Sequence, residues 1–399
     1  MTETEAAVVA ERGDRTCWRA GFMPLVDAAP LIVAHELGFA AAEGIELELV
    51  RETSWANIRD RMFLGHFDVA HLLAPMTVST RLGIGHVRSP LVAPFVLSRG
   101  GNSIAITPAL AAEGGDWGAP GDPFASGRTF ARVVAERAAR GAEPPTVAAV
   151  FPFSNHHYQL CHWLETAGVD PERDLRLVVV PPPHMVEAMT SGDVDAVCVG
   201  APWVGRAVEA GVGRLLLPTT ALWPASPEKV LAMREDFVRR SPAAVARLLA
   251  ALDRAARWCD AAENRGELAR LLARPGFVDV PAGELEHTLA GDLPLAPDGR
   301  RLAVDGFLRF HGATGEVPVN RPRQVDGLWC AAQMLRRGQW HDRIEAFAEA
   351  RRAFAPDLWD AAFGRPVDVG SESVTTFSGP AFAAEAPDGW LDAPRRPVG

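Results

Sequence analysis

The chain has 399 residues, of which 48% are apolar and 23% are charged, and its formal net charge is −10. That length and apolar content suffice to bury two compact lobes, so we expect two domains. An acidic chain without a clustered basic segment lacks the surface that phosphate backbones require, which argues against direct binding to DNA or RNA.

The N-terminal sequence and the cysteines bear on the compartment. The first residues, MTETEAAVVAER, carry acids where an export signal carries lysines, and their apolar stretch Ala6–Ala10 is too short for such a signal. No stretch reaches the roughly 18 apolar residues of a membrane-spanning helix. The five cysteines are scattered, which suits a reducing compartment better than a disulfide framework. We therefore expect a soluble, cytoplasmic protein.

Residues 16–100 predict the first part of one lobe. Asp27 is a candidate N-cap for a helix that has Pro30 in its first turn and runs to about Leu37, and a second helix opens at Trp55. Strands and helices alternate, so a βαβαβ order with parallel pairing is expected. The strand-like runs are Thr16–Phe22, Ile45–Val50, Phe67–Leu73 and Leu91–Leu97.

Residues 101–225 predict a second lobe of the same βα type. A helical pattern covers residues 130–140, and another helix opens after Phe151. Sheets of this kind bind ligands beyond the carboxyl ends of their strands, so polar groups at those ends are of interest. The strand-like runs are Ser103–Ile106, Leu175–Pro183, Asp195–Trp203 and Leu215–Leu222.

Residues 226–369 predict the return to the first lobe, followed by helices that pack back on it. The segment Trp223–Met233 is expected to carry the crossing, and Ser241 is expected to cap a helix with Pro242 at its first position. The tail, residues 370–399, has too little periodic apolar pattern for a folded unit, so we expect it to be disordered.

Common phosphate-binding and hydrolase motifs are absent from the sequence. The pair Gly83 and Gly85 lacks the third glycine of a dinucleotide motif, and neither G-x-x-x-x-G-K-[ST] nor G-x-S-x-G occurs. In the run from His156 to His162, His157 and Cys161 would share one helix face, but no fourth ligand is evident, so a metal site is not favoured. His156, at a helix start, suits either an anion contact or a structural role.

Four further residues are candidates for a ligand site, each with an ordinary structural explanation. Trp55 offers an indole N–H near a cleft but equally suits a core. Asn102 follows two glycines at the proposed crossing, where its amide can donate to a ligand or cap a turn. Gly200 ends a strand and permits close approach to the main chain, or serves the turn before Pro202. Lys229 is the cation best placed to neutralise an anion, although most lysines are surface residues.

Several runs, in order along the chain, resemble the nitrate- and bicarbonate-binding proteins of bacterial ABC importers, the NrtA/CmpA family. The resemblance is dense from about residue 19 to residue 236 and looser beyond. The runs are residues 22–31 (FMPLVDAAPL), 52–60 (ETSWANIRD), 70–76 (AHLLAPM), 178–186 (VVVPPPHMV) and 198–203 (CVGAPW).

The resemblance implies an α/β fold of the type II periplasmic-binding-protein kind, a two-lobed C-clamp with an oxyanion held in its cleft. Motif by motif, it implies that the anion is contacted by Trp55, Asn102, His156, Gly200 and Lys229. Asn102 departs from the importer proteins, which resemble this chain but carry Gln there. We expect the lobes to close over the anion, with the Lys229 ammonium balancing its charge, and Lys229→Ala to abolish binding while leaving the fold intact.

Within this family, the acidic start makes the chain most similar to the cytosolic nitrate/nitrite sensor NasS. That resemblance implies a partner, a NasT-like antiterminator protein of the ANTAR type, which the sensor sequesters until nitrate or nitrite binds. It implies no enzyme activity and no cofactor. One alternative is the substrate-binding component of a nitrate or bicarbonate importer. Another is an enzyme on the same fold, similar to those of thiamin-pyrimidine synthesis, that uses His66, His71 or the run that begins at His156.

Overall fold

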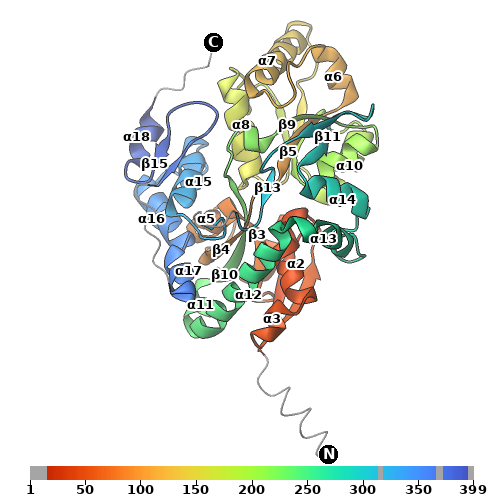
Figure 1. The fold of residues 1–399 in the computed structure, drawn as a ribbon. Coiled ribbons are helices and arrows are strands. Elements are labelled where there is room, and N and C mark those ends of the chain that lie inside the picture. Colours follow the sequence, from red (N-terminus) through yellow and green to blue (C-terminus); the bar gives the residue numbers. More distant parts are fainter. Residues whose placement is uncertain (1–15, 313–317, 365–371, 394–399) are drawn as a thin grey trace, which may run out of the picture.

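Two β-sheets, each covered by helices, form two lobes that lie one above the other in Figure 1. The computed structural model describes residues 16–312, 318–364 and 372–393. The first 15 residues, on which the expectation about an export signal depends, lie outside this part of the chain. The predicted two-lobed α/β architecture is confirmed, because the alternating apolar runs of the sequence form the strands of both sheets.

The sheet of lobe 1 has parallel strands on one side and antiparallel strands on the other. Strand β1 pairs in parallel with β2 and β3, as expected for the βαβαβ pattern, whereas β10 pairs antiparallel with β3 and β4. In sheet order the strands are β13 (Leu308–Arg309), β4 (Leu91–Gly100), β10 (Pro227–Arg234), β3 (Val69–Leu73), β1 (Thr16–Phe22) and β2 (Ile45–Arg51).

The sheet of lobe 2 repeats this arrangement with five strands. Strand β6 pairs in parallel with β7 and β8, and β5 pairs antiparallel with β8 and β9. In sheet order the strands are β7 (Arg176–Val179), β6 (Thr146–Ala149), β8 (Ala196–Gly200), β5 (Asn102–Ile106) and β9 (Arg214–Pro218).

Helices cover both sheets. Lobe 1 carries η1 (Val26–Ala28), α2 (Ala29–Glu36), α3 (Phe39–Ala42), α4 (Trp55–Phe63), α5 (Ala74–Leu82), α11 (Glu235–Arg240), α12 (Pro242–Asp260), η4 (Ala262–Asn264), α13 (Arg265–Leu272), α15 (Gln324–Arg336), α16 (Arg343–Ala353) and α17 (Pro356–Phe363). Lobe 2 carries α6 (Pro108–Gly114), α7 (Pro123–Ala139), α8 (Asn155–Thr166), η2 (Pro182–His184), α9 (Met185–Thr190), α10 (Trp203–Glu209) and η3 (Thr219–Ala221). The helix α14 (Ala282–Leu289) leads into the hairpin β11 (Asp292–Pro294) and β12 (Arg301–Ala303), which lies beside lobe 2.

The starts of three helices differ from the prediction in their position or their capping. In one case the predicted capping residue binds a distant partner, and in another a different residue caps the helix. Asp27 is not an N-cap, because the residue before α2 is Ala28 and the Asp27 carboxylate is engaged elsewhere. Ser241 does precede α12, but its side chain makes no capping bond. Helix α7 begins earlier than predicted because the Asp122 carboxylate accepts the N–H groups of Phe124 and Ala125.

The chain crosses between the lobes at two neighbouring places. Gly100 ends β4 and Gly101 links it to β5, while residues 219–226 join β9 to β10. The Gly100 N–H donates to the Ser226 carbonyl at 3.0 Å, so the two crossing segments are bonded to each other. Gly100 has φ +74°, and a Cβ built there would lie 2.3 Å from the Phe307 carbonyl oxygen. Both the backbone angle and the lack of space therefore require glycine.

We expect Gly100→Ala to lower the free energy of unfolding by about 2 kcal/mol or more, since the left-handed conformation and the clash with Phe307 both act against alanine. Gly141→Ala is the matched control, because Gly141 has φ +66° but open space around it. It should cost only about 1 kcal/mol. Urea unfolding of both variants measures the difference, and equal losses would contradict the steric argument.

The C-terminal helices pack back on lobe 1, as predicted, and also contact lobe 2. Helices α15 and α16 lie on α5, while the Tyr158 hydroxyl of α8 donates to Gln339 Oε1 at 2.8 Å. The expectation of a disordered tail is wrong for residues 372–393. That stretch forms β14 (Ser373–Val374), β15 (Phe382–Ala383) and α18 (Pro387–Asp392). A few aromatic contacts hold it without any helical periodicity, among them Phe382 against Trp390 at 5.5 Å.

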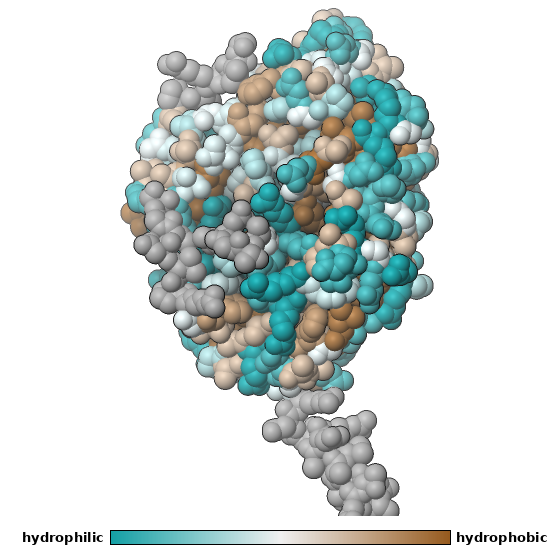
Figure 2. Space-filling model, in the orientation of Figure 1, coloured by the Kyte–Doolittle hydropathy of each residue, from teal (hydrophilic) through white to brown (hydrophobic). Residues whose placement is uncertain are grey.

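Most of the larger apolar side chains of the described residues lie in the interior of the protein. Among helices within the described ranges, none has the length and apolar content needed to cross a bilayer. In the view of Figure 2, hydrophilic side chains cover much of the surface, with apolar ones in separate patches. The larger apolar side chains instead fill the cores under the two sheets.

Candidate functional site

A buried ion pair lies at the edge of lobe 1 that faces lobe 2. The Lys229 ammonium on β10 lies 2.8 Å from Asp27 Oδ2, and His71 Nε2 on β3 lies 2.9 Å from Asp27 Oδ1. All three side chains are at most 3% exposed. Strands β3 and β10 bring Lys229 and His71 to one face, because Lys229 pairs with Leu73, two residues from His71.

The contacts of this cluster fix its protonation. The Met23 N–H donates to His71 Nδ1 at 3.3 Å, so His71 carries its proton on Nε2, the atom that lies 2.9 Å from Asp27 Oδ1. Burial alone would raise the pKa of the Asp27 carboxyl, but the Lys229 charge and the His71 contact outweigh burial and hold that pKa well below its usual range. Burial lowers the pKa of His71, and Asp27 offsets only part of this. At neutral pH, Asp27 is therefore ionised and His71 is neutral.

Lobe 2 brings three groups toward the same cluster. Asn102, at the start of β5, pairs in register with Gly200, at the end of β8. A Cβ built on Gly200 would lie 3.2 Å from Asn102 Oδ1 and 3.7 Å from Asp27 Oδ2. The absence of a side chain at Gly200 therefore lets the main chain of lobe 2 approach the lobe 1 carboxylate. His156 stands in the first turn of α8, a helix that Ser154 caps.

Trp55 closes the cluster on the lobe 1 side. Ser54 caps α4 and places Trp55 at its first position. The centroid of the Trp55 ring lies 5.4 Å from the centroid of the His71 ring. The same centroid lies 5.8 Å from the Lys229 ammonium nitrogen. The indole therefore packs on the ion pair as part of the core, with its edge available for a hydrogen bond.

Several polar atoms of the cluster are buried without a hydrogen-bond partner among the described residues. Among them are Trp55 Nε1 and both ring nitrogens of His156. Both atoms of the Asn102 amide also lack a well-aligned hydrogen bond, although this amide is close enough to Glu228 to act on its pKa. Each such atom costs about 1–3 kcal/mol, so native proteins keep few of them. Burial, with the nearby Lys229 charge, lowers the pKa of His156 well below its usual value. A neutral histidine and unpaired donors from two lobes are the features of a site for a small polar ligand.

A second polar network lies behind the site, on the segment that leads into β10. Gln159 Nε2 donates to Glu228 Oε1 at 2.7 Å and to Ser226 Oγ at 3.1 Å. Asn155 Nδ2 donates to the Pro227 carbonyl at 2.7 Å. Burial raises the pKa of Glu228, and Lys229 offsets part of that rise. This network fixes α8 of lobe 2 against the crossing.

The structure thus brings the five predicted residues into one place, together with two residues that sequence reasoning did not assign to the site. Asp27 was interpreted as a helix cap, and His71 was considered only for the enzyme alternative. Lys229, expected in the crossing segment Trp223–Met233, lies within strand β10 and is fully buried, and its charge is already paired with Asp27. The expectation that Lys229 stands alone to balance an anion is therefore wrong.

The histidine and cysteine run on α8 has a structural role. His157 Nε2 lies 3.8 Å from Cys161 Sγ, so these residues share a face as predicted. Burial lowers the pKa of His157 to about 4 and raises the pKa of Cys161 to about 12. Within the described residues, no group of three histidine, cysteine or acidic side chains is arranged to hold a metal ion.

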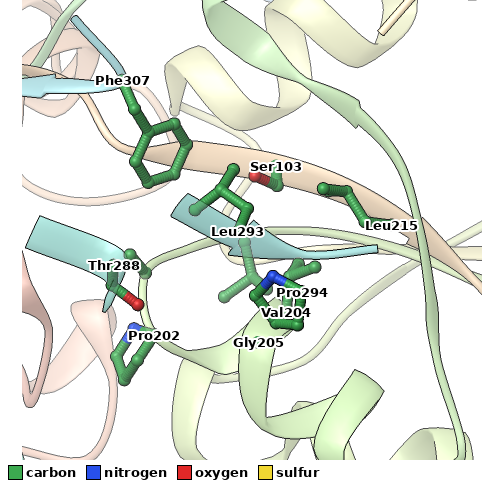
Figure 3. A pocket seen from close by; sticks show the side chains of 11 residues that line it. Ser103, Pro202, Val204, Gly205, Leu215, Thr288, Leu293, Pro294 and Phe307 are labelled. Carbon is green, nitrogen blue, oxygen red and sulfur yellow. The ribbon is translucent and has the colours of Figure 1, made fainter. Parts of the chain in front are cut away.

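A separate apolar pocket lies on the opposite face of the lobe 2 sheet. Figure 3 shows Leu293 between Phe307 and Leu215, with Ser103 close by. Ser103 follows Asn102 in β5, and neighbouring strand residues point to opposite faces, so this pocket does not open on the Asp27 cluster. Its mainly apolar lining does not suit an oxyanion.

Comparisons with known proteins show which family the chain belongs to. The model of the NMT1-like family matches residues 13–273. The chain is 31% identical to the nitrate/nitrite binding protein NrtA of Synechococcus elongatus, over 93% of this chain and 84% of NrtA. It is 29% identical to the bicarbonate-binding protein CmpA of the same organism, over 94% of this chain and 85% of CmpA.

A longer relative and a solved structure extend these matches. The chain is 32% identical to the nitrate import ATP-binding protein NrtC of Synechocystis sp., over 93% of this chain, and it spans about half of that protein, 54% of its length. The crystal structure of the periplasmic nitrate-binding protein NrtA from Synechocystis PCC 6803 superposes with a TM-score of 0.84 and 28% identity, covering 95% of this chain and 98% of NrtA.

NrtA and CmpA are named as binding proteins and not as enzymes. The fold, the sequence identity and the shared length agree across these comparisons. The chain belongs to the NMT1-like family and, within it, to the NrtA/CmpA group of nitrate- and bicarbonate-binding proteins with a two-lobed periplasmic-binding-protein fold.

Proposed function

We propose that this chain binds a small monovalent oxyanion, with nitrate as the first candidate, between its two lobes. The observation that carries the proposal is that Trp55 Nε1 of lobe 1 and both ring nitrogens of His156 of lobe 2 are buried without a hydrogen-bond partner among the described residues. Nitrate has three acceptor oxygens, and hydrogen bonds to a charged acceptor are the stronger kind. The names of the relatives NrtA and CmpA support the same ligand class.

Binding from two lobes gives a mechanism for closure. An anion that contacts Trp55 and His156 at once gains contacts in the closed state that the open state lacks. Moving the equilibrium from 1:99 to 99:1 needs about 5.5 kcal/mol of differential affinity. Two or three charge-assisted hydrogen bonds, at about 1.5–3 kcal/mol each, supply that amount.

Isothermal titration of the purified protein with nitrate, nitrite, bicarbonate and sulfate tests the proposal. We expect a binding isotherm for at least one of the first three anions. Small-angle scattering with the same anions would report closure as a smaller radius of gyration. No binding of any of these anions at millimolar concentration would refute the proposal.

Trp55→Phe should weaken nitrate binding by about 10- to 100-fold, because it removes one N–H donor to a charged ligand and keeps most of the ring. Trp359→Phe is the matched control. Trp359 Nε1 is also buried without a partner among the described residues, but it lies on α17, away from the site. Equal affinities of the two variants, measured by titration, would exclude Trp55 from the ligand contacts.

We propose two roles that the same anion chemistry serves. The first is the substrate-binding component of a nitrate or bicarbonate importer, which the names of NrtA, CmpA and NrtC support. The second is a cytoplasmic NasS-like sensor that releases a NasT-like antiterminator when nitrate or nitrite binds. The motif resemblance supports this second role.

The two roles differ in what recognises the protein. Size-exclusion chromatography of the chain with an ANTAR-type antiterminator, with and without nitrate, tests the sensor role. A complex that dissociates on addition of nitrate supports it. If no complex forms without nitrate, the sensor role is refuted and the importer role is retained.

A further inference from the structure

Without a bound anion, the candidate site already has a defined net charge. Lys229 is the cation of the cluster, and its ammonium lies 2.8 Å from the ionised carboxylate of Asp27. Both side chains are almost completely buried, so water screens their mutual attraction little. His71, the other contact of Asp27, is neutral because its Nδ1 accepts the Met23 N–H. The Asp27, His71 and Lys229 cluster therefore has a net charge of zero.

Among the residues that the structure describes, the other titratable groups that face this cluster add no positive charge. His156 of α8 faces both Lys229 and Asp27, and its ring is neutral when nothing else is bound. Glu228, next to Lys229 on β10, contributes either no charge or a negative one. Trp55 of α4 and Asn102 of β5 are uncharged. A monovalent anion thus enters a site with no excess positive charge, and a divalent anion would leave two uncompensated charges in a buried volume.

We propose that Asp27 is the residue that determines which anions the site accepts, because its pairing with Lys229 restricts the site to monovalent oxyanions and makes their binding depend on proton uptake. Both ring nitrogens of His156 lack a hydrogen-bond partner among the described residues, and we assign that proton to them, since an imidazolium there donates two hydrogen bonds and restores neutrality. This inference rests on the proposed function. It adds a restriction on the charge of the bound anion, which the anion-binding proposal does not require.

Asp27→Asn tests the restriction to monovalent anions, because this substitution removes one negative charge and keeps the shape of the side chain. We expect the affinity for sulfate, relative to nitrate, to rise at least tenfold in competition titrations, since Lys229 would then offer an unpaired charge. His71→Gln is the comparison variant, because it disturbs the placement of Asp27 without changing the net charge. Its sulfate-to-nitrate ratio should equal that of the wild type. If the ratio of sulfate affinity to nitrate affinity in Asp27→Asn equals that of the wild type, the proposal is overturned. The same holds if sulfate displaces nitrate from neither protein.

A measurement on the wild-type protein keeps the proposal testable even if Asp27→Asn does not fold. Calorimetric titration with nitrate at pH 7, in two buffers with different ionisation enthalpies, gives the number of protons taken up. We expect about one proton per anion, falling to near zero in His156→Gln. No uptake in the wild type, or the same uptake in His156→Gln, would overturn the proposal. If the wild type binds none of the tested anions, the proposed function itself fails.

Discussion

Lys229→Met is expected to abolish nitrate binding and to lower the free energy of unfolding by about 3–5 kcal/mol, the usual cost of removing one partner of a buried ion pair. The methionine fills similar volume but leaves the Asp27 carboxylate buried with His71 as its remaining partner. Denaturant unfolding and calorimetric titration measure the two effects. The sequence alone led us to expect that Lys229→Ala would leave the fold intact, and the burial of Lys229 reverses that expectation.

The double variant Asp27→Asn with Lys229→Met separates the two effects. Because it removes both charges, it should recover most of the lost stability but none of the binding. If Lys229→Met alone is as stable as the wild type, the ion pair is not a buried element of the folded protein. If the double variant binds nitrate, Lys229 is not part of the site.

Acidification to pH 5 is expected to destabilise the protein through the histidines of α8. Burial lowers the pKa of His157 and of His162 to about 4 in the folded protein, against about 6.5 in the unfolded chain. Between these values the unfolded chain binds more protons, so the free energy of unfolding falls as the pH falls through this window. Both rings keep some contact with water, so we expect about 1–2 kcal/mol per histidine at pH 5.

Urea unfolding at pH 7.5 and pH 5 measures this effect. His157→Gln with His162→Gln should reduce the difference between the two pH values, whereas His184→Gln, at a histidine whose side chain is 56% exposed, is the control. His71 and His156 act in the same direction, so some pH dependence remains in the double variant. A double variant with the full wild-type dependence would contradict the assignment to α8.

The sequence predicted most strands of the two sheets because they are short apolar runs between turn residues, but it missed β6 and β13 and interpreted β10 as part of a crossing. The first strand, Thr16–Phe22, has the predicted bounds, and the parallel pairing followed from the alternation of strands and helices. The tail could not be predicted, because pairwise contacts such as that of Phe382 with Trp390 leave no periodic pattern in the sequence.

The candidate site was only partly predictable, for a physical reason that Asp27 illustrates. An aspartate just before a helix with an early proline has the local signature of an N-cap. Its real partners, His71 and Lys229, are 44 and 202 positions away along the numbering and meet it only when β3 and β10 pair. Local signals identify a residue as polar and well placed, but tertiary pairing decides its charge partner.

The two crossings have a consequence for the lobe closure that the proposed function involves. Strands β4 and β10 are neighbours in one sheet, and the segments that leave them are bonded to each other through Gly100 and Ser226. The C-terminal helices and the β11–β12 hairpin also contact lobe 2, so a change in the angle between the lobes would shift those contacts together with the two crossings. Under the proposed closure, a molecule that touches both lobes would register an occupied site through these contacts without ever reaching the ion.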